Sequence, residues 1–399
     1  MNNADDQASK HRQRASPDGS RGYRTRRSRR RRGFRAYAGL LVAAVIAVVG
    51  ACLLYLWTSE PIPAAAAPDR PAVARGEAVE RTAALAPLNL PADHAPHGSG
   101  MEWWYYNGIL DAKTGERYAV HVAVFVANTL VKHTVMHVAL TDLQTGKRFS
   151  SQSRTGGVPA QRVANGYDFR QEGWRVAASG ASHVLSASFE GASIALDLSD
   201  SAPVVAHRAA GSKTPGLLDF GASGISYYYS RPRMSAQGWI SVGGAPVQVS
   251  GQAWYDHQWG DFDVLSLGWN WFALHLADGS DLMLYELFDR DGRKVTTAGT
   301  ISTASGSTPI QPGDVELLPV TRWTSPRTRI DYAVGWRIKL PSGVLDVKPF
   351  YADSEFDSST TTANVYWEGP VKVTGATTGE GFLELSGYDR LSAAPTNRR

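Results

Sequence analysis

The sequence predicts an all-β protein of two tandem β-barrels, preceded by a transmembrane helix and a tether rich in proline and alanine. Apolar residues recur at every second position between Tyr118 and Val126, which is the period of a β-strand. Near-identical turn sequences at 111–115 and 142–146 follow apolar runs, as expected for hairpins. The same succession of strands and turns restarts after Trp259, so we expect two such units within the 399 residues.

The N-terminal residues 1–35 carry most of the positive charge. They hold one lysine and eleven arginines against three aspartates, a net charge of +9, whereas the whole chain is only +4. The folded part is therefore slightly acidic, and the basic pI belongs to the tail. We predict no nucleic-acid partner, since such a domain would need basic patches on its own surface.

Residues 36–57 form an uncharged run of 22 residues. As a helix this run would be about 33 Å long, enough to cross a bilayer. Positive charge precedes it, which predicts a cytoplasmic tail, a single-pass anchor in the inner membrane and C-terminal domains in the periplasm. Two alternatives stay open: export with cleavage near 64–66, and a lipoprotein signal ending at Cys52.

Residues 58–92 are rich in alanine and proline and predict a semi-extended linker without regular structure. Cys52 is the only cysteine of the chain, so the exported part has no disulfide and depends on its core for stability.

The body divides at the restart into a predicted N-terminal barrel, 93–260, and a C-terminal barrel, 261–392. Short strands with turn signals every 8–12 residues or so are typical of a sandwich or a barrel. The pattern is weakest at 312–330, where several prolines and threonines occur. The stretch 251–260 falls at the junction of the two units, and domain junctions are common ligand sites.

The junction stretch combines an acid, an imidazole and two indoles: Trp254, Asp256, His257 and Trp259. Indole around Asp256 would remove water from it and favour its neutral, proton-carrying form. Two other stretches also pair a carboxylate with aromatic residues, around Glu102 and around Glu368.

Several familiar motifs are missing from the sequence, among them G-x-S-x-G, the Walker loop and G-x-G-x-x-G. His133 and His137 have the spacing of metal ligands only on a helix, because four strand residues span about 13 Å. We therefore predict neither a metal nor another cofactor. The other histidines that could serve as ligands are His94, His97, His121 and His257.

Five blocks together resemble the signature blocks of the carotenoid 1,2-hydratase/AttH-like family, in family order, between His97 and Tyr388. The blocks are Glu102-Trp103-Trp104-Tyr105, Tyr227-Tyr228-Tyr229-Ser230-Arg231, Ala253-Trp254-Tyr255-Asp256-His257-Gln258-Trp259, Trp269-Asn270-Trp271-Phe272-Ala273-Leu274 and Tyr366-Trp367-Glu368-Gly369. The resemblance implies two lipocalin-like barrels and relatives that hydrate isoprenoid or prenyl double bonds. The basic tail, the anchor, and Phe288 in place of an arginine depart from the pigment-pathway enzymes.

Hydration of an alkene needs an acid, aromatic faces for a developing cation, and water. Asp256 is the expected proton donor, Glu102 and Glu368 are second choices or position the water, and His257 orients the acid or the water. The expected pocket wall consists of Trp103, Trp104, Tyr229, Trp254, Trp259 and Trp271.

A structural interpretation stays open beside the catalytic one. Asp256 could cap a turn between the barrels, and Arg231 or Arg233 could pair with Glu102 or Asp256 and keep the acid ionised. For the whole protein, the sequence favours a tethered periplasmic protein that binds a hydrophobic, isoprenoid or lipid-like ligand and hydrates or isomerises a double bond. The alternatives are a lipid-binding accessory of an ABC transporter, without catalysis, and a secreted hydrolase.

Overall fold

A computed structural model of the chain describes residues 85–391, apart from 129–130, 159, 209–211 and 213. The predicted tail, the predicted anchor at 36–57 and most of the tether lie outside these residues. Within the described part of the chain, no helix has the length and apolar character needed to span a membrane.

The described residues form two antiparallel sheets, which confirms the all-β prediction. Along the main path of the first sheet, the strands in spatial order are β4 (Arg148–Gly156), β3 (Lys132–Asp142), β2 (Arg117–Asn128), β1 (Met101–Ala112), β13 (Val247–Phe262), β12 (Gly224–Val242), β9 (Ala192–Asp200), β8 (Ser182–Phe189), β7 (Trp174–Ser179), β6 (Gly166–Gln171) and β5 (Ala160–Val163). Two short strands, β10 (Val205–Ala206) and β11 (Leu217–Asp219), pair with β12.

The second sheet follows the first in the chain and begins six residues after β13 ends. Its spatial order is β17 (Gly306–Ile310), β16 (Lys294–Thr303), β15 (Asp281–Phe288), β14 (Gly268–Leu276), β23 (Gly379–Ser386), β22 (Val365–Gly375), β20 (Gly343–Pro349), β19 (Asp331–Leu340) and β18 (Glu316–Thr324), with β21 (Glu355–Asp357) on β22. Short 3₁₀ turns η1 (Ala92–His94), η2 (Gly221–Ser223), η3 (Val264–Ser266), η4 (Pro312–Asp314) and η5 (Tyr388–Arg390) complete the fold.

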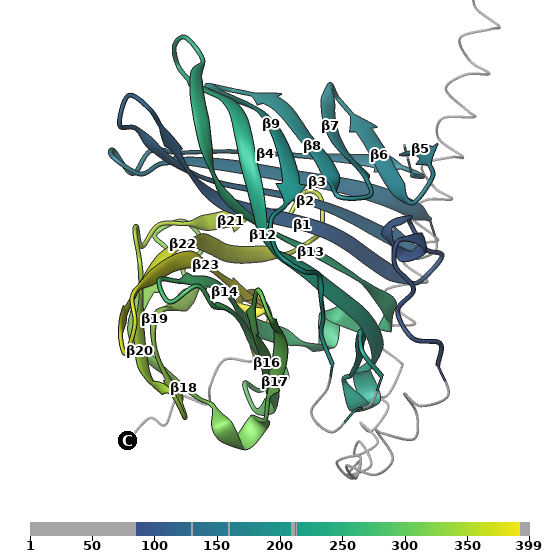
Figure 1. Ribbon diagram of the computed structural model, residues 1–399, viewed down its shortest axis with the longest axis vertical. Helices are drawn as coiled ribbons and strands as arrows, with labels where there is room; N and C mark the ends of the chain where they lie inside the picture. Colours follow the sequence, from purple (N-terminus) through teal and green to yellow (C-terminus); the bar gives the residue numbers. More distant parts are fainter. Residues whose placement is uncertain (1–84, 129–130, 159, 209–211, 213, 392–399) are drawn as a thin grey trace, which may run out of the picture. The chain divides into compact units, whose positions relative to one another are not determined.

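The two sheets differ in how far they curl. In Figure 1 the second sheet, green to yellow, bends into a nearly closed barrel, whereas the first, blue to teal, is a half-barrel. Among the described residues, neither sheet pairs its first strand with its last. Both sheets are thus barrel-like, but among the described residues neither is closed by hydrogen bonds between its two edge strands.

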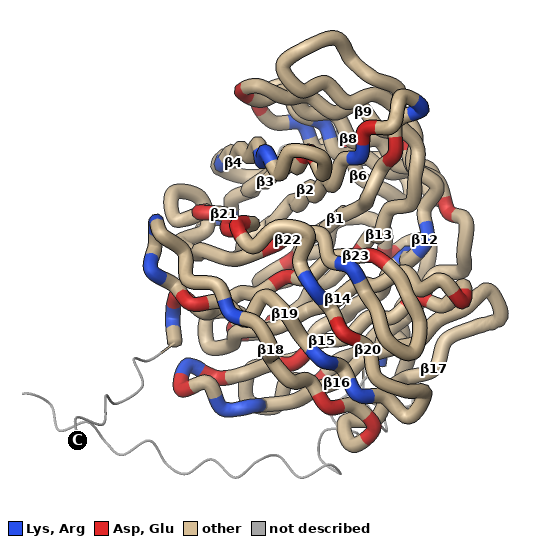
Figure 2. The backbone as a smooth tube through the Cα atoms, turned by 90° about the vertical axis from the view of Figure 1, so that its left-hand side faces the viewer, with Lys and Arg blue, Asp and Glu red and all other residues tan. Residues whose placement is uncertain are grey.

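The turns form where the sequence places them. Gly115 ends the turn from β1 to β2, and Gly146 ends the turn from β3 to β4, both with positive φ. A left-handed backbone favours glycine because it lacks a Cβ atom. Acidic and basic residues are interspersed along the tube in Figure 2, as on an ordinary solvated surface.

Three large apolar clusters and one small one make up the interior of the described part of the chain. One fills the half-barrel around Trp104 and Tyr106, and a second fills the other barrel around Phe272 and Trp367. The third joins residues of both sheets, among them Tyr105, Trp254 and Trp271, and strand β1 contacts β23 there. The interface between the sheets is therefore a core of its own, and it surrounds the candidate site.

Candidate functional site

A large cavity lies where the two sheets face each other. Its volume is about 810 Å³, within the range of pockets for small ligands. Most of its wall is aromatic or aliphatic, contributed by β1, β2, β12, β14 and β15. Its aromatic residues include Trp103, Tyr105, Tyr228, Trp269, Trp271 and Tyr285. Such a cavity suits an apolar or partly aromatic ligand.

Strand β13 positions the acid of this cavity. Consecutive residues of a strand point to opposite faces, so Trp254 and Asp256 belong to the interface side, and Tyr255 and His257 to the half-barrel interior. Every residue from 253 to 260 is buried, because β13 is covered on both faces. Asp256 is 3% exposed and borders the cavity.

Three neutral donors hold Asp256. Trp254 Nε1 donates to Oδ1 at 2.6 Å, Ser230 Oγ donates to the same oxygen, and Tyr228 Oη donates to Oδ2 at 2.8 Å. Burial raises the pKa of Asp256 to about 7, although these hydrogen bonds oppose the shift. Near neutral pH a substantial fraction of Asp256 therefore carries a proton.

Ser230 connects Asp256 to a buried histidine that the sequence did not single out. His207, directly after the short strand β10, approaches Ser230 Oγ with Nε2 at 2.6 Å and Thr300 Oγ1 with Nδ1 at 2.9 Å. Burial lowers the pKa of His207 to about 3, so its ring is neutral. If Nε2 carries the proton, every donor along this line meets an acceptor.

Two further acids border the same cavity, on adjacent strands of the second sheet. Glu368 on β22 lies directly opposite Glu384 on β23. Burial raises the pKa of Glu368 well above its usual value, and the charge of Glu384 adds to this. Burial also raises the pKa of Glu384 to about 7, with a contribution from the charge of Asp256. Tyr105 Oη donates a hydrogen bond to Glu368.

A second cluster occupies the other face of β13, inside the half-barrel. Glu102 Oε1 accepts hydrogen bonds from His97 Nδ1 and His257 Nε2, both at 2.8 Å. Burial opposes the ionisation of Glu102, but the bonds from His257 and His97 outweigh it and lower its pKa. Trp259 stacks on His97 at 4.1 Å, and Trp104 stacks on His257 at 4.8 Å.

The predicted residues thus separate into two sites. Asp256, Glu368, Trp103 and Trp271 border the cavity, and Trp254 lies directly behind Asp256. The remaining predicted residues face the half-barrel interior, namely Glu102, His257, Trp104, Tyr229 and Trp259. His257 therefore does not orient Asp256, because neighbouring residues of a strand cannot share a face.

Two structural roles considered for Asp256 are also corrected. It lies in the middle of β13, and Asp263 is the residue that caps the turn, accepting from Leu265 N at 3.1 Å and Ser266 N at 3.2 Å. Neither arginine pairs with Asp256 or Glu102. Arg231 pairs with Asp200, and Arg233 Nε binds Asp281 at 2.8 Å.

The sequence interpretation missed Tyr228, Ser230, His207 and Glu384. The sequence analysis places Tyr229 in the pocket wall, but its neighbour Tyr228 is the residue that borders the cavity. The predicted strand face is therefore wrong here, as it is at His257. Glu384 carried a signal, because it is the only charged residue in the apolar run 382–385. No sequence feature connects His207 to Asp256, since Ser230 links the two and the position of His207 depends on the loop that carries β10.

An all-β protein of two barrel-like antiparallel sheets, with an acid-bearing aromatic cavity between them, is the class that this fold and site define. The family model described as AttH-like matches residues 81–388, so the chain belongs to the AttH-like family. This confirms the resemblance seen in the sequence blocks.

Individual relatives agree with this assignment. The chain is 26% identical over 190 residues to kievitone hydratase from Fusarium solani subsp. phaseoli, covering 46% of this chain and 52% of the relative. It thus spans about half the length of this curated relative.

Two solved structures share the fold. A protein from Nitrosomonas europaea described as an AttH superposes with a TM-score of 0.69 at 28% identity, covering 76% of this chain and 99% of the other. Kievitone hydratase from Nectria haematococca superposes with a TM-score of 0.63 at 17% identity, covering 76% and 94%.

Proposed function

We propose that the protein is a hydratase-type acid catalyst that adds water to a carbon–carbon double bond of a hydrophobic ligand bound between the sheets. The observation that carries the proposal is Asp256, a buried acid at an aromatic cavity with three neutral donors and a pKa of about 7. A carboxyl group kept partly neutral near pH 7 can act as a general acid. The family and the kievitone hydratase relative support this reaction class.

The proposed reaction balances with the residues present. Neutral Asp256 transfers its proton to one alkene carbon, which leaves a carbocation at the other. The faces of Trp103, Trp271 and neighbouring rings stabilise this cation electrostatically. A water oxygen then bonds to the cation and releases a proton, which restores neutral Asp256, so the sum is alkene plus water giving an alcohol.

Glu368 and Glu384 fit a role in holding the water. Two carboxyl groups directly opposite on adjacent strands resist double ionisation, so they tend to share one proton. A shared proton offers a donor and acceptors to one water molecule at the cavity wall. The proton released by the water that adds to the cation can then pass among Asp256, Glu368 and Glu384.

Replacing Asp256 by asparagine tests the proposal. The side-chain amide of Asp256→Asn keeps the size of the acid and an oxygen that can accept from Trp254 and Ser230, but it supplies no acidic proton. We expect turnover to fall at least about a hundredfold, with ligand affinity changed only a few-fold. Kievitone and linear isoprenoid alkenes in H₂¹⁸O are suitable probes, with ¹⁸O in an alcohol product as the readout.

Asp168→Asn is the matched control. Asp168 is also buried, but it pairs with Arg170 and Arg175 away from the cavity, so turnover should stay as in the unaltered protein. Full turnover in Asp256→Asn would end the proton-donor role. Ligand binding without turnover in the unaltered protein would instead assign the cavity to a lipid-binding accessory.

We also propose that the N-terminal run 36–57 anchors these domains to the inner membrane, with the barrels in the periplasm. The uncharged length and the preceding arginines support this topology. A reporter fused after Arg399 should be active outside the cytoplasm, with the intact N-terminus retained in the membrane. Release of a chain starting near residue 67 would contradict the anchor and favour a cleaved signal.

A further inference from the structure

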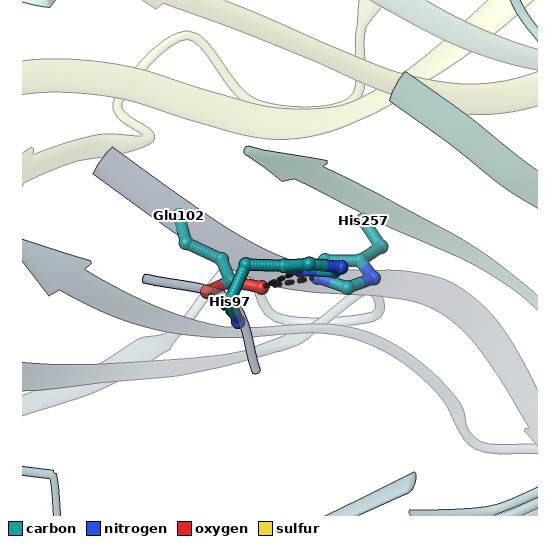
Figure 3. A group of neighbouring side chains, drawn as sticks. All are labelled: His97, Glu102 and His257. Carbon is teal, nitrogen blue, oxygen red and sulfur yellow. Dashed lines mark hydrogen bonds and ion pairs between the residues drawn. The ribbon is translucent and has the colours of Figure 1, made fainter. Parts of the chain in front are cut away.

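The cluster inside the half-barrel has the composition of a metal site. One ligand atom from each of His97, Glu102 and His257 lies within 4.8 Å of the others (Figure 3). Glu102 Oε1 is 2.8 Å from both His97 Nδ1 and His257 Nε2. They come from the segment before β1, from β1 itself and from β13, and the three side chains point toward one another. We propose that these residues bind one divalent transition-metal ion, Zn²⁺ foremost, at a site separate from the Asp256 cavity.

The donor set selects the kind of metal. Two imidazoles and one carboxylate form a three-residue set used for zinc, with a fourth position left for water. Mg²⁺ and Ca²⁺ prefer oxygen ligands, so they should bind here much more weakly.

Each proposed ligand has an outer partner that would orient it. The other ring nitrogen of His97 faces Asp93 Oδ1 at 3.6 Å, and the other nitrogen of His257 faces Tyr229 Oη at 3.1 Å. The second oxygen of Glu102 accepts from the His97 backbone N–H at 2.8 Å. Metal-binding histidines nearly always have such partners, which fix the ring and its protonated nitrogen.

Charge also favours a cation here. Glu102 is 1% exposed, and its ion-pair partners among the described residues are both histidines. A buried carboxylate is costly unless a cation or a metal compensates it. One divalent ion together with Glu102 and Asp93 would make the group neutral.

The hydrogen-bond chain behind His257 can accommodate the ion. Without metal, Tyr229 donates to His257 Nδ1, and His257 Nε2 donates to Glu102. With metal on Nε2, the proton of His257 moves to Nδ1 and points at Tyr229. The Tyr229 hydroxyl can then donate to Tyr255 Oη, 3.4 Å away, while still accepting from His94 Nδ1 at 2.7 Å.

An ion can reach the cluster through His97. Its side chain is 24% exposed, whereas His257 and Glu102 are essentially fully buried. The ring is held in place by stacking on Trp259, with the two planes at 3°. The site is therefore open on one side and preorganised on the other two.

Zinc titration of the full chain tests the proposal. The detergent-extracted protein, without a polyhistidine tag, is stripped with a chelator and titrated against a chromophoric zinc indicator, then with Co²⁺. We expect one Zn²⁺ per chain and the visible absorption of four-coordinate Co²⁺. Saturating zinc should raise the melting temperature, because an ion bound only by the folded state stabilises it.

Three substitutions and a control variant test whether these residues bind the zinc ion. His97→Ala is the first variant, since its partly exposed ring is least needed for folding, and Glu102→Gln is the second. Each should lose at least about a hundredfold in zinc affinity, and Asp93→Asn about tenfold. His275→Ala should bind zinc unchanged, because His275 meets a single carboxylate, Asp281, at 2.7 Å. Absence of zinc binding by the unaltered chain, or full affinity in folded His97→Ala, would overturn the site.

Discussion

The two acid clusters on opposite faces of β13 are equally buried but differ in the charge state of their carboxyl groups. Asp256 meets only hydroxyl and indole donors, and burial raises its pKa to about 7. Glu102 meets two imidazoles and a backbone amide, and its pKa is lowered despite burial. Burial alone thus does not set the protonation state of a carboxyl group. The imidazole partners of Glu102 can share or carry positive charge, whereas the hydroxyl and indole partners of Asp256 cannot.

The largest effect should appear in the pH dependence of stability at Asp256. A carboxyl group with a raised folded pKa stabilises the fold below its unfolded pKa of 3.8, and this contribution is lost as pH rises through about 7. The loss is about 1.4 kcal/mol per pH unit, roughly 4 kcal/mol in all. Asp256→Asn should therefore gain stability relative to the unaltered protein as pH rises, measured by denaturant unfolding from about pH 4 to pH 8. A difference that does not vary with pH would mean that Asp256 is ionised throughout.

The same exchange of acid for amide on the other face should have the opposite outcome. Glu102→Gln removes a buried charge that accepts three hydrogen bonds, and its amide would meet the His97 N–H with another donor. We expect a loss of about 2 kcal/mol in the free energy of unfolding near pH 7. Urea unfolding of both amide variants at one pH makes the comparison, and equal stabilities would remove the contrast between the faces.

The smallest expected effect is a difference in ligand affinity between variants of two tryptophans, both of which the sequence analysis places in the pocket wall. Trp103 borders the cavity, whereas Trp259 stacks on Tyr227 and His97 on the other face. Trp103→Ala should weaken binding of a hydrophobic ligand about tenfold, or about 1.4 kcal/mol, through lost apolar contact. Trp259→Ala should reduce stability and leave that affinity within a few-fold. Calorimetric titration decides, and equal losses of affinity would place both residues at the ligand.

Local patterns were enough to predict most of the strands. Alternation and turn chemistry anticipated β2 and the turns at Gly115 and Gly146. The strand β18 was hardest to recognise, because Pro319 lies at a register shift and its residues are largely exposed. A broken ladder without a buried face leaves little periodic signal.

The site could be predicted only in part, for a physical reason that β13 illustrates. A strand with one wet face shows alternation that reveals which residues point inward, but both faces of β13 are buried. Asp256 and His257 therefore looked equally suited to one pocket. The partners Glu384 and His207 come from distant elements, and only tertiary packing brings them near Asp256.

The protonation state of Asp256 itself can be measured directly. Infrared difference spectra between the unaltered protein and Asp256→Asn, recorded across the pH range with ¹³C-labelled aspartate, isolate the carboxyl stretch of this residue. We predict a protonated carboxyl band at about pH 5 that gives way to a carboxylate band with a midpoint near 7. A carboxylate band already complete at about pH 5 would contradict it, because an ionised Asp256 has no proton to give to an alkene.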